Sequence, residues 1–370
     1  MAQTLKVIGL MSGTSLDGVD AALLETDGED VVRAGPALGL AYEPQMRALL
    51  RQALDDAQTV AAGAPVPYAI RDAERRLTEV HANAVEALLK KVGLVPRQVS
   101  LIGFHGQTIL HKQDRRWTWQ LGDGALLARL TGIDVVNDFR SADVKAGGHG
   151  APLVPLYHAA LIRKAALYDL PVVLVNIGGV ANVTYIGKDE ILAFDTGPGN
   201  APIDDWMQRH SGRPVDDNGD VARTGKVDDV ALNAMLANEF FDIRPPKSLD
   251  RLDFGTRAVE GLSPEDGAAT LTAFTAAAIA KAREHFPGMP NTWIVCGGGR
   301  HNKTLMDALR ARVNAPVLAA EDAGWNGDFI EAEAFAYLAV RSVKGLPLSL
   351  PSTTGVREPM TGGKLHRARS

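Results

Sequence analysis

Val7-Ile-Gly-Leu-Met-Ser-Gly-Thr-Ser-Leu-Asp-Gly-Val-Asp20 is the stretch that decides the fold of this 370-residue chain. An apolar run over 5–10 leads into a turn of glycines and hydroxyl side chains, and a second apolar run over 19–24 follows. The pattern predicts a β-hairpin whose turn offers backbone N–H groups and hydroxyls with little side-chain bulk. Such a turn suits the oxygens of a polyphosphate, which need many donors at close range.

The two carboxylates of this turn, Asp17 and Asp20, would repel a phosphate by themselves. They become favourable when a divalent cation lies between them and the nucleotide, so we expect Mg²⁺ at Asp17, bound through water. For Ser-Gly-Thr-Ser considered alone, an ordinary hairpin turn is an equal alternative. The nucleotide-binding residues predicted in this segment are Ser12, Gly13, Thr14, Ser15, Leu16, Asp17, Gly18, Val19 and Asp20.

Size and composition describe a globular protein of two domains. The 370 residues exceed what one hydrophobic core supports. The net charge of −5 gives no electrostatic reason to expect nucleic acid or an anionic membrane as partner. The apolar runs fall short of the ~20 residues of a membrane span, and no signal-peptide pattern opens the chain. Cys296 is the only cysteine, which excludes an intramolecular disulfide and favours a reducing cytoplasm.

The second half of the chain repeats the organisation of the first. An apolar run over 172–175, a turn at Gly178 and Gly179, and a run over 183–186 again predict strand, glycine turn, strand. The repetition is structural and does not extend to the sequence. It predicts the α/β architecture of actin, sugar kinases and heat-shock chaperone ATPases, in which two domains face each other across a central cleft.

The glycine-rich stretch around 146–152 is the expected domain junction, giving an N-terminal actin-like domain at 1–145 and a C-terminal one at 146–370. We expect the last helix to pack back near the junction and the tail after 361 to be disordered. Helical spacing of apolar residues predicts helices at 43–57, 68–92, 125–130, 158–168, 303–312 and 331–344, with another carrying Ile203, Trp206 and Met207. Further strands are predicted at 100–103, 117–121, 133–136, 191–194 and 293–295.

Asp195 is the leading catalytic candidate. It ends an apolar strand, just before Gly-Pro-Gly-Asn and a helix. Phosphoryl transfer to a hydroxyl, or attack by water, needs a carboxylate that takes a proton. An N-cap or Asx-turn role is the structural alternative. His105 also follows a strand and can hydrogen-bond a polar ligand, although a structural histidine is the commoner case.

Three glycines between a strand and a helix, in Cys296-Gly-Gly-Gly-Arg-His-Asn302, let the backbone approach a flat base or ribose. Gly297, Gly298 and Gly299 are therefore predicted to bind the nucleotide, together with Gly178 and Gly179. The chain contains no GxxxxGK[ST] motif and no clean GxGxxG, so neither a P-loop nor a dinucleotide fold is supported. No HExxH or Cys/His cluster indicates a transition metal.

Over nearly its whole length the chain resembles the anhydro-N-acetylmuramic acid kinases, bacterial enzymes of cell-wall recycling in the sugar-kinase and actin-like superfamily. Its motifs keep the order of the family. They are Gly9-Leu-Met-Ser-Gly-Thr-Ser-Leu-Asp-Gly18, Phe104-His-Gly-Gln-Thr108, Thr131-Gly-Ile-Asp-Val-Val136, Asp138-Phe-Arg140, 146–155, Asn176-Ile-Gly-Gly179, Asp195-Thr-Gly-Pro-Gly-Asn200, Pro246-Lys-Ser248, Cys296-Gly-Gly-Gly299, Glu331-Ala-Glu-Ala-Phe-Ala336 and Leu350-Pro-Ser-Thr-Thr-Gly355.

The resemblance implies an ATP- and Mg²⁺-dependent reaction that opens the 1,6-anhydro bridge of anhydro-N-acetylmuramic acid and phosphorylates O6. It assigns Asp195 as the general base that activates water against the anomeric carbon, while O6 attacks the γ-phosphoryl group. Glu331, Arg140 and His105 are the implied substrate-binding residues, with Arg140 pairing with the lactyl carboxylate. The resemblance also implies a small-molecule sugar partner and a homodimer. The charge and the short apolar runs predict no nucleic acid or membrane partner, and the lone cysteine predicts a cytoplasmic location.

Three other functions compete with this one. A kinase of another 1,6-anhydro sugar, such as levoglucosan, would not depend on the lactyl and acetamido groups. A non-catalytic actin-like ATP-binding module would turn over ATP slowly and independently of any sugar. A simple hydroxyl-sugar kinase would phosphorylate free N-acetylmuramic acid at least as well as the anhydro form.

Overall fold

The computed structural model describes residues 3–13, 15–61, 63–165, 168–249 and 253–368. Contacts divide the chain into two compact units. Unit 1 comprises Met1–Lys164 and Phe329–Ser370, and unit 2 comprises Ala165–Asp328. This grouping differs from the expected ranges 1–145 and 146–370. The difference arises because α5 (Pro155–Ala165) and α10 (Ile330–Val343) pack together, with Tyr157 Oη donating to Glu333 Oε2 at 2.6 Å.

Unit 1 is built on a six-stranded sheet in the order β13-β7-β4-β1-β2-β3. The first three strands form an antiparallel meander, β4 and β7 add to β1 in parallel, and β13 closes the edge antiparallel to β7. The strands are β1 (Leu5–Met11), β2 (Gly18–Thr26), β3 (Val32–Ala41), β4 (Leu101–Phe104), β7 (Val135–Asn137) and β13 (Lys364–His366).

Unit 2 repeats this topology in a five-stranded sheet of order β10-β9-β8-β11-β12. Again three antiparallel strands precede two parallel ones. The strands are β8 (Val172–Ile177), β9 (Val180–Ile186), β10 (Ile191–Pro198), β11 (Thr292–Cys296) and β12 (Val317–Ala319). Two units with the same strand order confirm the predicted actin-like α/β fold.

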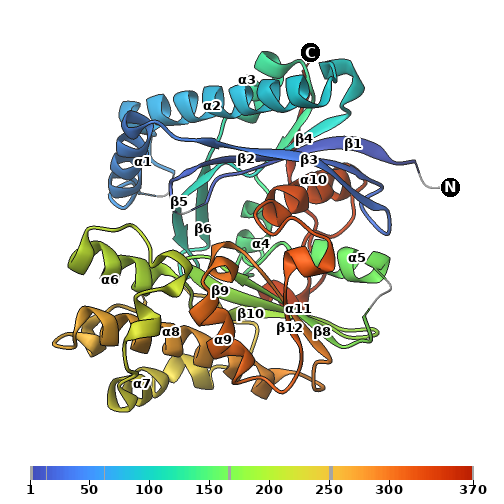
Figure 1. Ribbon diagram of the computed structural model, residues 1–370. Coiled ribbons are helices and arrows are strands. Elements are labelled where there is room, and N and C mark those ends of the chain that lie inside the picture. Colours follow the sequence, from blue (N-terminus) through green and yellow to red (C-terminus); the bar gives the residue numbers. More distant parts are fainter. Residues whose placement is uncertain (1–2, 14, 62, 166–167, 250–252, 369–370) are drawn as a thin grey trace. The chain divides into compact units, whose positions relative to one another are not determined.

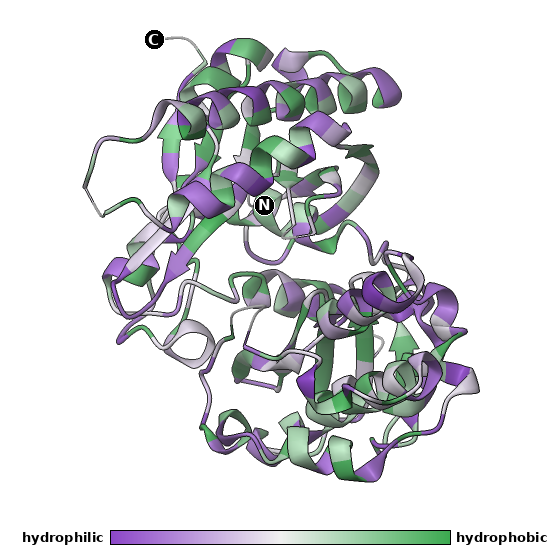
Figure 2. Cartoon of the chain, turned by 90° about the vertical axis from the view of Figure 1, so that its left-hand side faces the viewer, coloured by the Kyte–Doolittle hydropathy of each residue, from purple (hydrophilic) through white to green (hydrophobic). Residues whose placement is uncertain are grey.

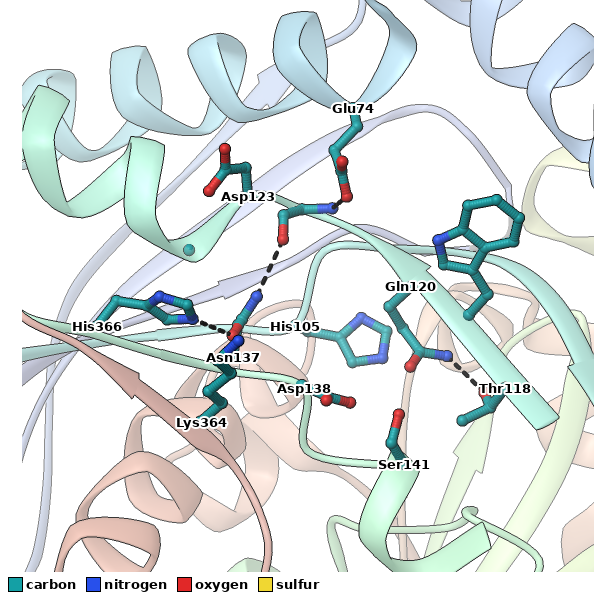
Figure 3. A pocket seen from close by; sticks show the side chains of 13 residues that line it. Glu74, His105, Thr118, Gln120, Asp123, Asn137, Asp138, Ser141, Lys364 and His366 are labelled. Carbon is teal, nitrogen blue, oxygen red and sulfur yellow. Dashed lines mark hydrogen bonds between the residues drawn. The ribbon is translucent and has the colours of Figure 1, made fainter. Parts of the chain in front are cut away.

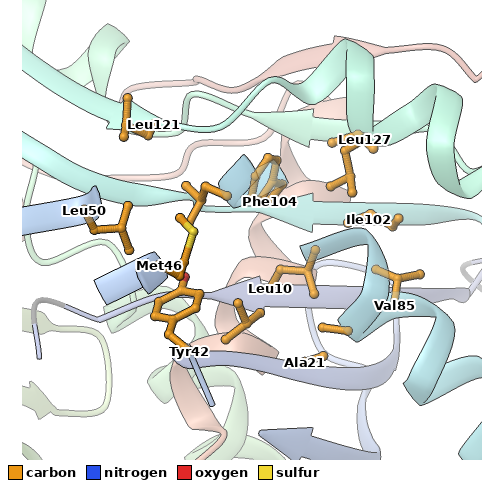
Figure 4. Close-up of a cluster of buried hydrophobic side chains, with 14 of the residues drawn as sticks. Leu10, Ala21, Tyr42, Met46, Leu50, Val85, Ile102, Phe104, Leu121 and Leu127 are labelled. Carbon is orange, nitrogen blue, oxygen red and sulfur yellow. The ribbon is translucent and has the colours of Figure 1, made fainter. Parts of the chain in front are cut away.

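Helices cover the unit 1 sheet, with α2 along one face and α10 along the other (Figure 1). Leu10 and Phe104 of the sheet, Leu50 of α1 and Val85 of α2 belong to one buried cluster (Figure 4). The additional elements of unit 1 are α1 (Pro44–Ala57), α2 (Tyr68–Val92), the hairpin β5 (Gln107–Lys112) and β6 (Trp117–Leu121), α3 (Gly124–Thr131), α4 (Ser141–Lys145) and α11 (Pro351–Thr354).

A pair of glycines lets α10 approach the sheet closely. Gly9 of β1 and Gly103 of β4 are partners in the parallel register. A Cβ atom at Gly9 would lie 1.7 Å from Ala332 O, and one at Gly103 would lie 2.0 Å from Phe335 O. Both strand positions therefore require glycine, because any side chain would push the helix away from the sheet.

The helices of unit 2 are α6 (Ala201–Ser211), α7 (Asp229–Leu236), α8 (Pro264–Lys281) and α9 (Lys303–Arg310). Of these, α8 is buried on opposite sides by two different clusters. Ile279 packs with the sheet and α9, whereas Phe274 packs with α6 and α7. Figure 2 shows the hydrophobic interior of the strands beside helices that alternate hydrophobic and hydrophilic residues.

The structure confirms most of the predicted elements, including the helix over 68–92 and the strand over 117–121 at their predicted bounds. The predicted disorder after residue 361 is wrong, because β13 pairs with β7 and Arg367 forms an ion pair with Asp134 at 2.6 Å. Within the described ranges, every helix is too short or too polar to cross a membrane.

Candidate functional site

The turn between β1 and β2 is held in a strained backbone conformation. Leu16 has a φ of 56°, which is unfavourable for a bulky side chain, and its side chain is buried in the unit 1 core. Tyr42 N donates to Asp17 O at 2.9 Å, and Ser15 Oγ donates to Asp17 Oδ1 at 2.8 Å. The turn therefore presents Ser15 and Asp17 at the surface in fixed positions.

Three residues predicted to bind the nucleotide through this turn also make internal contacts that shape the hairpin. Ser12 Oγ lies inside the protein, 2.6 Å from Tyr42 Oη and 3.0 Å from His81 Nε2. Val19 is fully buried, and a Cβ at Gly18 would lie 2.4 Å from the carbonyl oxygen of Leu40. Thr14 lies outside the described residues. Nucleotide contacts at the other residues of the turn, Leu16 included, stay predictions.

His81 explains why Ser12 is held so firmly. Its Nδ1–H donates to Leu77 O at 2.8 Å, which leaves Nε2 to accept from the Ser12 hydroxyl. Burial lowers the pKa of His81 to about 4, so the imidazole is neutral near pH 7 and this pattern persists. The Tyr42–Ser12–His81 chain ties the turn to α2, and sequence analysis did not identify its two partner residues.

The predicted substrate residues Arg140 and His105 come together at the ends of β7 and β4. Arg140 Nε donates to His105 Nε2 at 2.9 Å, and Arg140 Nη1 donates to Gly150 O at 2.6 Å. His105 Nδ1 donates to Gly106 O at 2.7 Å, which assigns the neutral Nδ1–H tautomer. Burial, and then the charge of Arg140, hold the pKa of His105 well below its usual range.

Glu331, the third predicted substrate residue, belongs to the same group. It lies in the first turn of α10, half-buried. Burial raises its pKa, and the nearby charge of Arg140 acts against that rise. The sheet ends and the α10 N-terminus thus assemble an arginine, a neutral histidine and a carboxyl group within unit 1.

A polar pocket of about 340 Å³ continues from His105. Figure 3 shows Asp138 and Ser141 below His105, Gln120 and Thr118 to its right, and Asn137 to its left. Asn137 is fixed at both ends of its amide, donating to Gly122 O and lying 2.9 Å from His366 Nε2. Amide, hydroxyl and carboxyl groups around one space are the donors and acceptors that a hydroxylated ring requires. The full lining is Glu74, His105, Thr118, Trp119, Gln120, Gly122, Asp123, Gly124, Asn137, Asp138, Ser141, Lys364 and His366.

Asp195 lies within β10, in unit 2, at a β-bulge between Asp195 and Gly197. Its backbone N–H donates to Lys247 O at 2.9 Å, and Leu249 N–H donates to its carboxylate Oδ2 at 2.8 Å. The side chain is 7% exposed. The bulge and the flanking 247–249 segment therefore hold one buried carboxylate in a defined orientation.

Lys247 anchors that segment from inside unit 2. Its ammonium donates to Phe240 O at 3.0 Å and to Phe241 O at 3.4 Å, and it lies 4.4 Å from the centroid of the Phe240 ring. Burial, helped by the charge of Lys281, lowers its pKa to about 8. Its place in the Pro246-Lys-Ser248 motif was the only sequence signal for this role.

The two glycine turns of unit 2, at 178–179 and at 297–299, lie close to neighbouring segments of the same unit. Gly178 O accepts from Asn200 N at 2.7 Å, and Gly179 O accepts from Gly199 N at 2.9 Å. A Cβ at Gly297 would lie 2.4 Å from Asn176 Oδ1, and one at Gly299 would lie 2.3 Å from the Ile177 side chain.

These turns leave room at only some positions. A Cβ at Gly298 would meet nothing nearer than 3.7 Å, and one at Gly13 nothing nearer than 3.4 Å. Packing therefore does not require glycine at Gly298 or Gly13, whereas it does at Gly297 and Gly299.

Arg300, which directly follows the glycines, is buried and forms two ion pairs that sequence analysis did not predict. It pairs with Glu321 at 2.8 Å and with Asp328 at 2.7 Å, and its side chain is 2% exposed. In the part of the chain that the structure describes, no three His, Cys, Asp or Glu side chains are grouped to hold a metal ion.

Comparisons with known proteins agree on one family. The family model described as anhydro-N-acetylmuramic acid kinase matches residues 5–368. The enzyme of that name from Rhizorhabdus wittichii is 54% identical over 97% of this chain and 98% of its own length. Those of Paramagnetospirillum magneticum and Methylobacterium nodulans are 53% and 52% identical, over 97% of this chain and 99% of theirs.

Solved structures align more loosely. The Acidaminococcus fermentans (R)-2-hydroxyglutaryl-CoA dehydratase component A overlays with a TM-score of 0.49 at 12% identity, covering 92% of this chain and 99% of that one. The assignment rests on the family model and the relatives instead. The chain belongs to the anhydro-N-acetylmuramic acid kinase family.

Proposed function

We propose that this protein opens the 1,6-anhydro bridge of anhydro-N-acetylmuramic acid with water and phosphorylates O6 with ATP, giving N-acetylmuramic acid 6-phosphate and ADP. Membership of the kinase family supports the reaction class. The single observation that carries the substrate assignment is Arg140, fixed by His105 and Gly150 next to Glu331 and beside a polar pocket.

In unit 1, Arg140 is the proposed partner of the lactyl carboxylate. A planar guanidinium whose Nε and Nη1 are both held has a fixed plane, which suits recognition of a carboxylate. Because His105 is neutral, its Nε2 can accept from Arg140 Nε and so help to hold the guanidinium. The pocket of about 340 Å³ is within the usual size of a small-molecule site, and we assign it to the polar substituents of the sugar.

In unit 2, Asp195 is the proposed general base. Its carboxylate takes a proton from water as the water oxygen bonds to C1 of the sugar, and the C1–O6 bond breaks. The electron pair of that bond stays on O6, which then attacks the γ-phosphoryl group. As the O6–P bond forms, the bond from the γ-phosphorus to the bridging oxygen breaks and ADP leaves. Leu249 N–H occupies Oδ2, so it fixes the orientation of the carboxylate during this transfer.

ATP and Mg²⁺ are the proposed cofactors. The surface residues Ser15 and Asp17 of the first turn, with the backbone at Gly13 and Gly298, are the proposed contacts to the nucleotide and, at Asp17, to the metal through water. When bound, Mg²⁺ neutralises charge on the transferring phosphoryl group. The proposed sugar residues belong to unit 1 and the proposed base belongs to unit 2.

We also propose a cytoplasmic location, which rests on the lone cysteine, and a homodimer, which rests on the family resemblance.

A panel of sugars tests the function. ATP turnover should depend on anhydro-N-acetylmuramic acid and exceed turnover with levoglucosan, with free N-acetylmuramic acid and without sugar. Equal or faster turnover with levoglucosan would move the substrate to other anhydro sugars. Preference for the free sugar would indicate a simple hydroxyl kinase, and sugar-independent turnover a non-catalytic ATP-binding module.

A further inference from the structure

Asp143 is a buried carboxylate that the reaction described above does not use. It lies in the short helix α4 of unit 1 and is 2% exposed. Its Oδ1 accepts from Gly150 N at 2.7 Å, and its Oδ2 accepts from Thr354 Oγ1 at 2.6 Å and from Ser349 Oγ. None of these three donors carries a charge. Burying a carboxylate costs free energy even when it is well hydrogen-bonded, so this site calls for an explanation.

The donors to Asp143 come from two segments that are distant in sequence. Gly150 belongs to the glycine-rich stretch after α4. Ser349 lies just before α11, and Thr354 is the last residue of α11. The first stretch also returns to Asp143 through its backbone, because Gly148 N donates to Asp143 O at 2.9 Å. A Cβ at Gly148 would lie 2.2 Å from Asp143 Oδ1, so glycine is required there. Asp143 thus joins two of the motifs that carry the family resemblance.

The same glycine-rich stretch holds the substrate-site arginine. Gly150 N–H donates to Asp143, and the carbonyl of Gly150 accepts from Arg140 Nη1 at 2.6 Å. Arg140 Nε in turn donates to His105 Nε2. A continuous chain of hydrogen bonds therefore runs from the buried carboxylate through Gly150 to the guanidinium. Moving Gly150 would release one of the two bonds that set the plane of Arg140.

We propose that Asp143 is a positioning residue: it fixes Gly150, and through Gly150 the guanidinium of Arg140, so that the site prefers a sugar bearing a carboxylate. This inference rests on the proposed function, because it takes Arg140 as the partner of the lactyl group. Asp143 itself does not touch the substrate. Its effect appears as selectivity for the carboxylate rather than as a change in the chemical step.

The test compares two sugars, anhydro-N-acetylmuramic acid and 1,6-anhydro-N-acetylglucosamine, which lacks the lactyl group. Asp143→Ala should lower kcat/KM for the first sugar about tenfold, mainly through KM, because an oriented hydrogen bond to a charged group is worth roughly that much. For the second sugar, kcat/KM should stay within about twofold, the range expected of independent sites. Asp143→Asn, which can still accept from Gly150 N–H, should recover most of the loss.

Asp134→Ala is the matched control. Asp134 also accepts a backbone N–H, from Ala368, but it lies at the opposite end of β7 from Arg140. This control should leave the ratio of the two sugars unchanged. If Asp143→Ala fails to fold, the double variant Ser349→Ala/Thr354→Val loosens the carboxylate less severely and should shift the ratio in the same direction by a smaller factor.

A double-mutant cycle with Arg140→Ala identifies the route of the effect. In the Arg140→Ala background, Asp143→Ala should change kcat/KM by less than about twofold, since the two residues act through one contact. Equal losses for both sugars, an additive loss in that background, or an unchanged ratio in a folded variant would overturn the inference. Absence of sugar-dependent turnover in the unmodified protein would instead overturn the proposed function.

Discussion

The two units share a strand order but bury opposite charges behind their candidate sites. In unit 1, the buried anion Asp143 supports the cation Arg140 through Gly150. In unit 2, the buried cation Lys247 supports the anion Asp195 through the backbone of its own segment. We therefore propose that the two units, which share a strand order, serve different chemistry through the charged residue beneath each candidate site.

The hairpin turns of the units differ in a similar way. The first turn of unit 1 carries Ser15 and Asp17 at the surface. The corresponding turn of unit 2 is made of Gly178 and Gly179, whose carbonyls hold the start of α6. We therefore expect the metal-dependent contacts to come from unit 1, while the glycines of unit 2 allow close approach of backbone segments.

The largest effect is expected from Asp195→Asn. Removing the base should lower kcat by ~10²–10⁴-fold, the usual contribution of general-base catalysis, while nucleotide affinity changes only a few-fold. Steady-state kinetics and calorimetric nucleotide titration measure the two quantities. Asp189→Asn, in the exposed turn just before β10, is the matched control. Turnover close to that of the unmodified protein would remove Asp195 from the role.

Replacement of the cation beneath Asp195 should have the next largest effect. Lys247→Met loses the bonds to the carbonyls of Phe240 and Phe241, so kcat should fall about tenfold through the looser 247–249 segment, with both KM values within about twofold. Lys281→Met removes a more exposed cation of the same cluster and should leave kcat unchanged. A rise in KM without a fall in kcat would place Lys247 in binding instead.

A buried acid in unit 1 should make stability depend on pH. Burial raises the pKa of Glu333 to about 7, although Tyr157 donates to it. The folded state therefore binds this proton more tightly than the unfolded state does. The resulting contribution of Glu333 to the free energy of unfolding is complete below the usual glutamate pKa and is lost as pH rises through about 7. The glutamine of Glu333→Gln does not titrate, so the Tm of this variant relative to the unmodified protein should rise between about pH 5 and pH 8. The corresponding relative gain in the free energy of unfolding is up to about 3 kcal/mol.

The difference in Tm between Glu333→Gln and the unmodified protein isolates the titration of Glu333. His81 and His158 also have pKa values lowered by burial, to about 4 and about 3, but both are present in each protein and cancel. Lys247 of unit 2 keeps its proton over most of this pH range. A Tm difference that is flat with pH would show that Glu333 is ionised in the folded state throughout.

The smallest effect is expected at the first turn. Asp17→Ala should raise the KM for Mg-ATP a few-fold and leave the KM for the sugar unchanged, because the carboxylate is exposed and acts through water. Asp30→Ala, another exposed carboxylate of unit 1, is the control. If KM and kcat for Mg-ATP are unchanged, Asp17 does not bind the metal. The proposed difference between the turns of the two units would then be wrong.

Local patterns were enough to predict much of the fold. The amphipathic stripe of 68–92 predicted α2 at its observed bounds. In contrast, α8 went unpredicted because Phe274 and Ile279 face different clusters, which removes any single apolar face. The strand β3 was also missed, since its residues are mostly exposed and it contains Pro36. The tail was wrongly predicted as disordered because pairing with β7 depends on a partner distant in sequence.

The candidate site was predictable where a motif carries the chemistry. Arg140, His105 and Glu331 were selected from separate motifs, and the structure brings them together. The hydrogen bonds of Asp143 beneath Arg140 were not predictable, because two of the donors to Asp143 are distant in sequence. The contacts of Ser12 were not predictable either: its hydroxyl lies inside the protein, against residues 30 and 69 positions away in sequence.

The most direct test of the central claim is the fate of the solvent oxygen. Turnover of ATP with anhydro-N-acetylmuramic acid in ¹⁸O-labelled water, followed by mass analysis, locates the label in the product. The account predicts one ¹⁸O at C1 and an unlabelled phosphate on O6. Label in the phosphate, or none at C1, would contradict water attack at the anomeric carbon and with it the role assigned to Asp195.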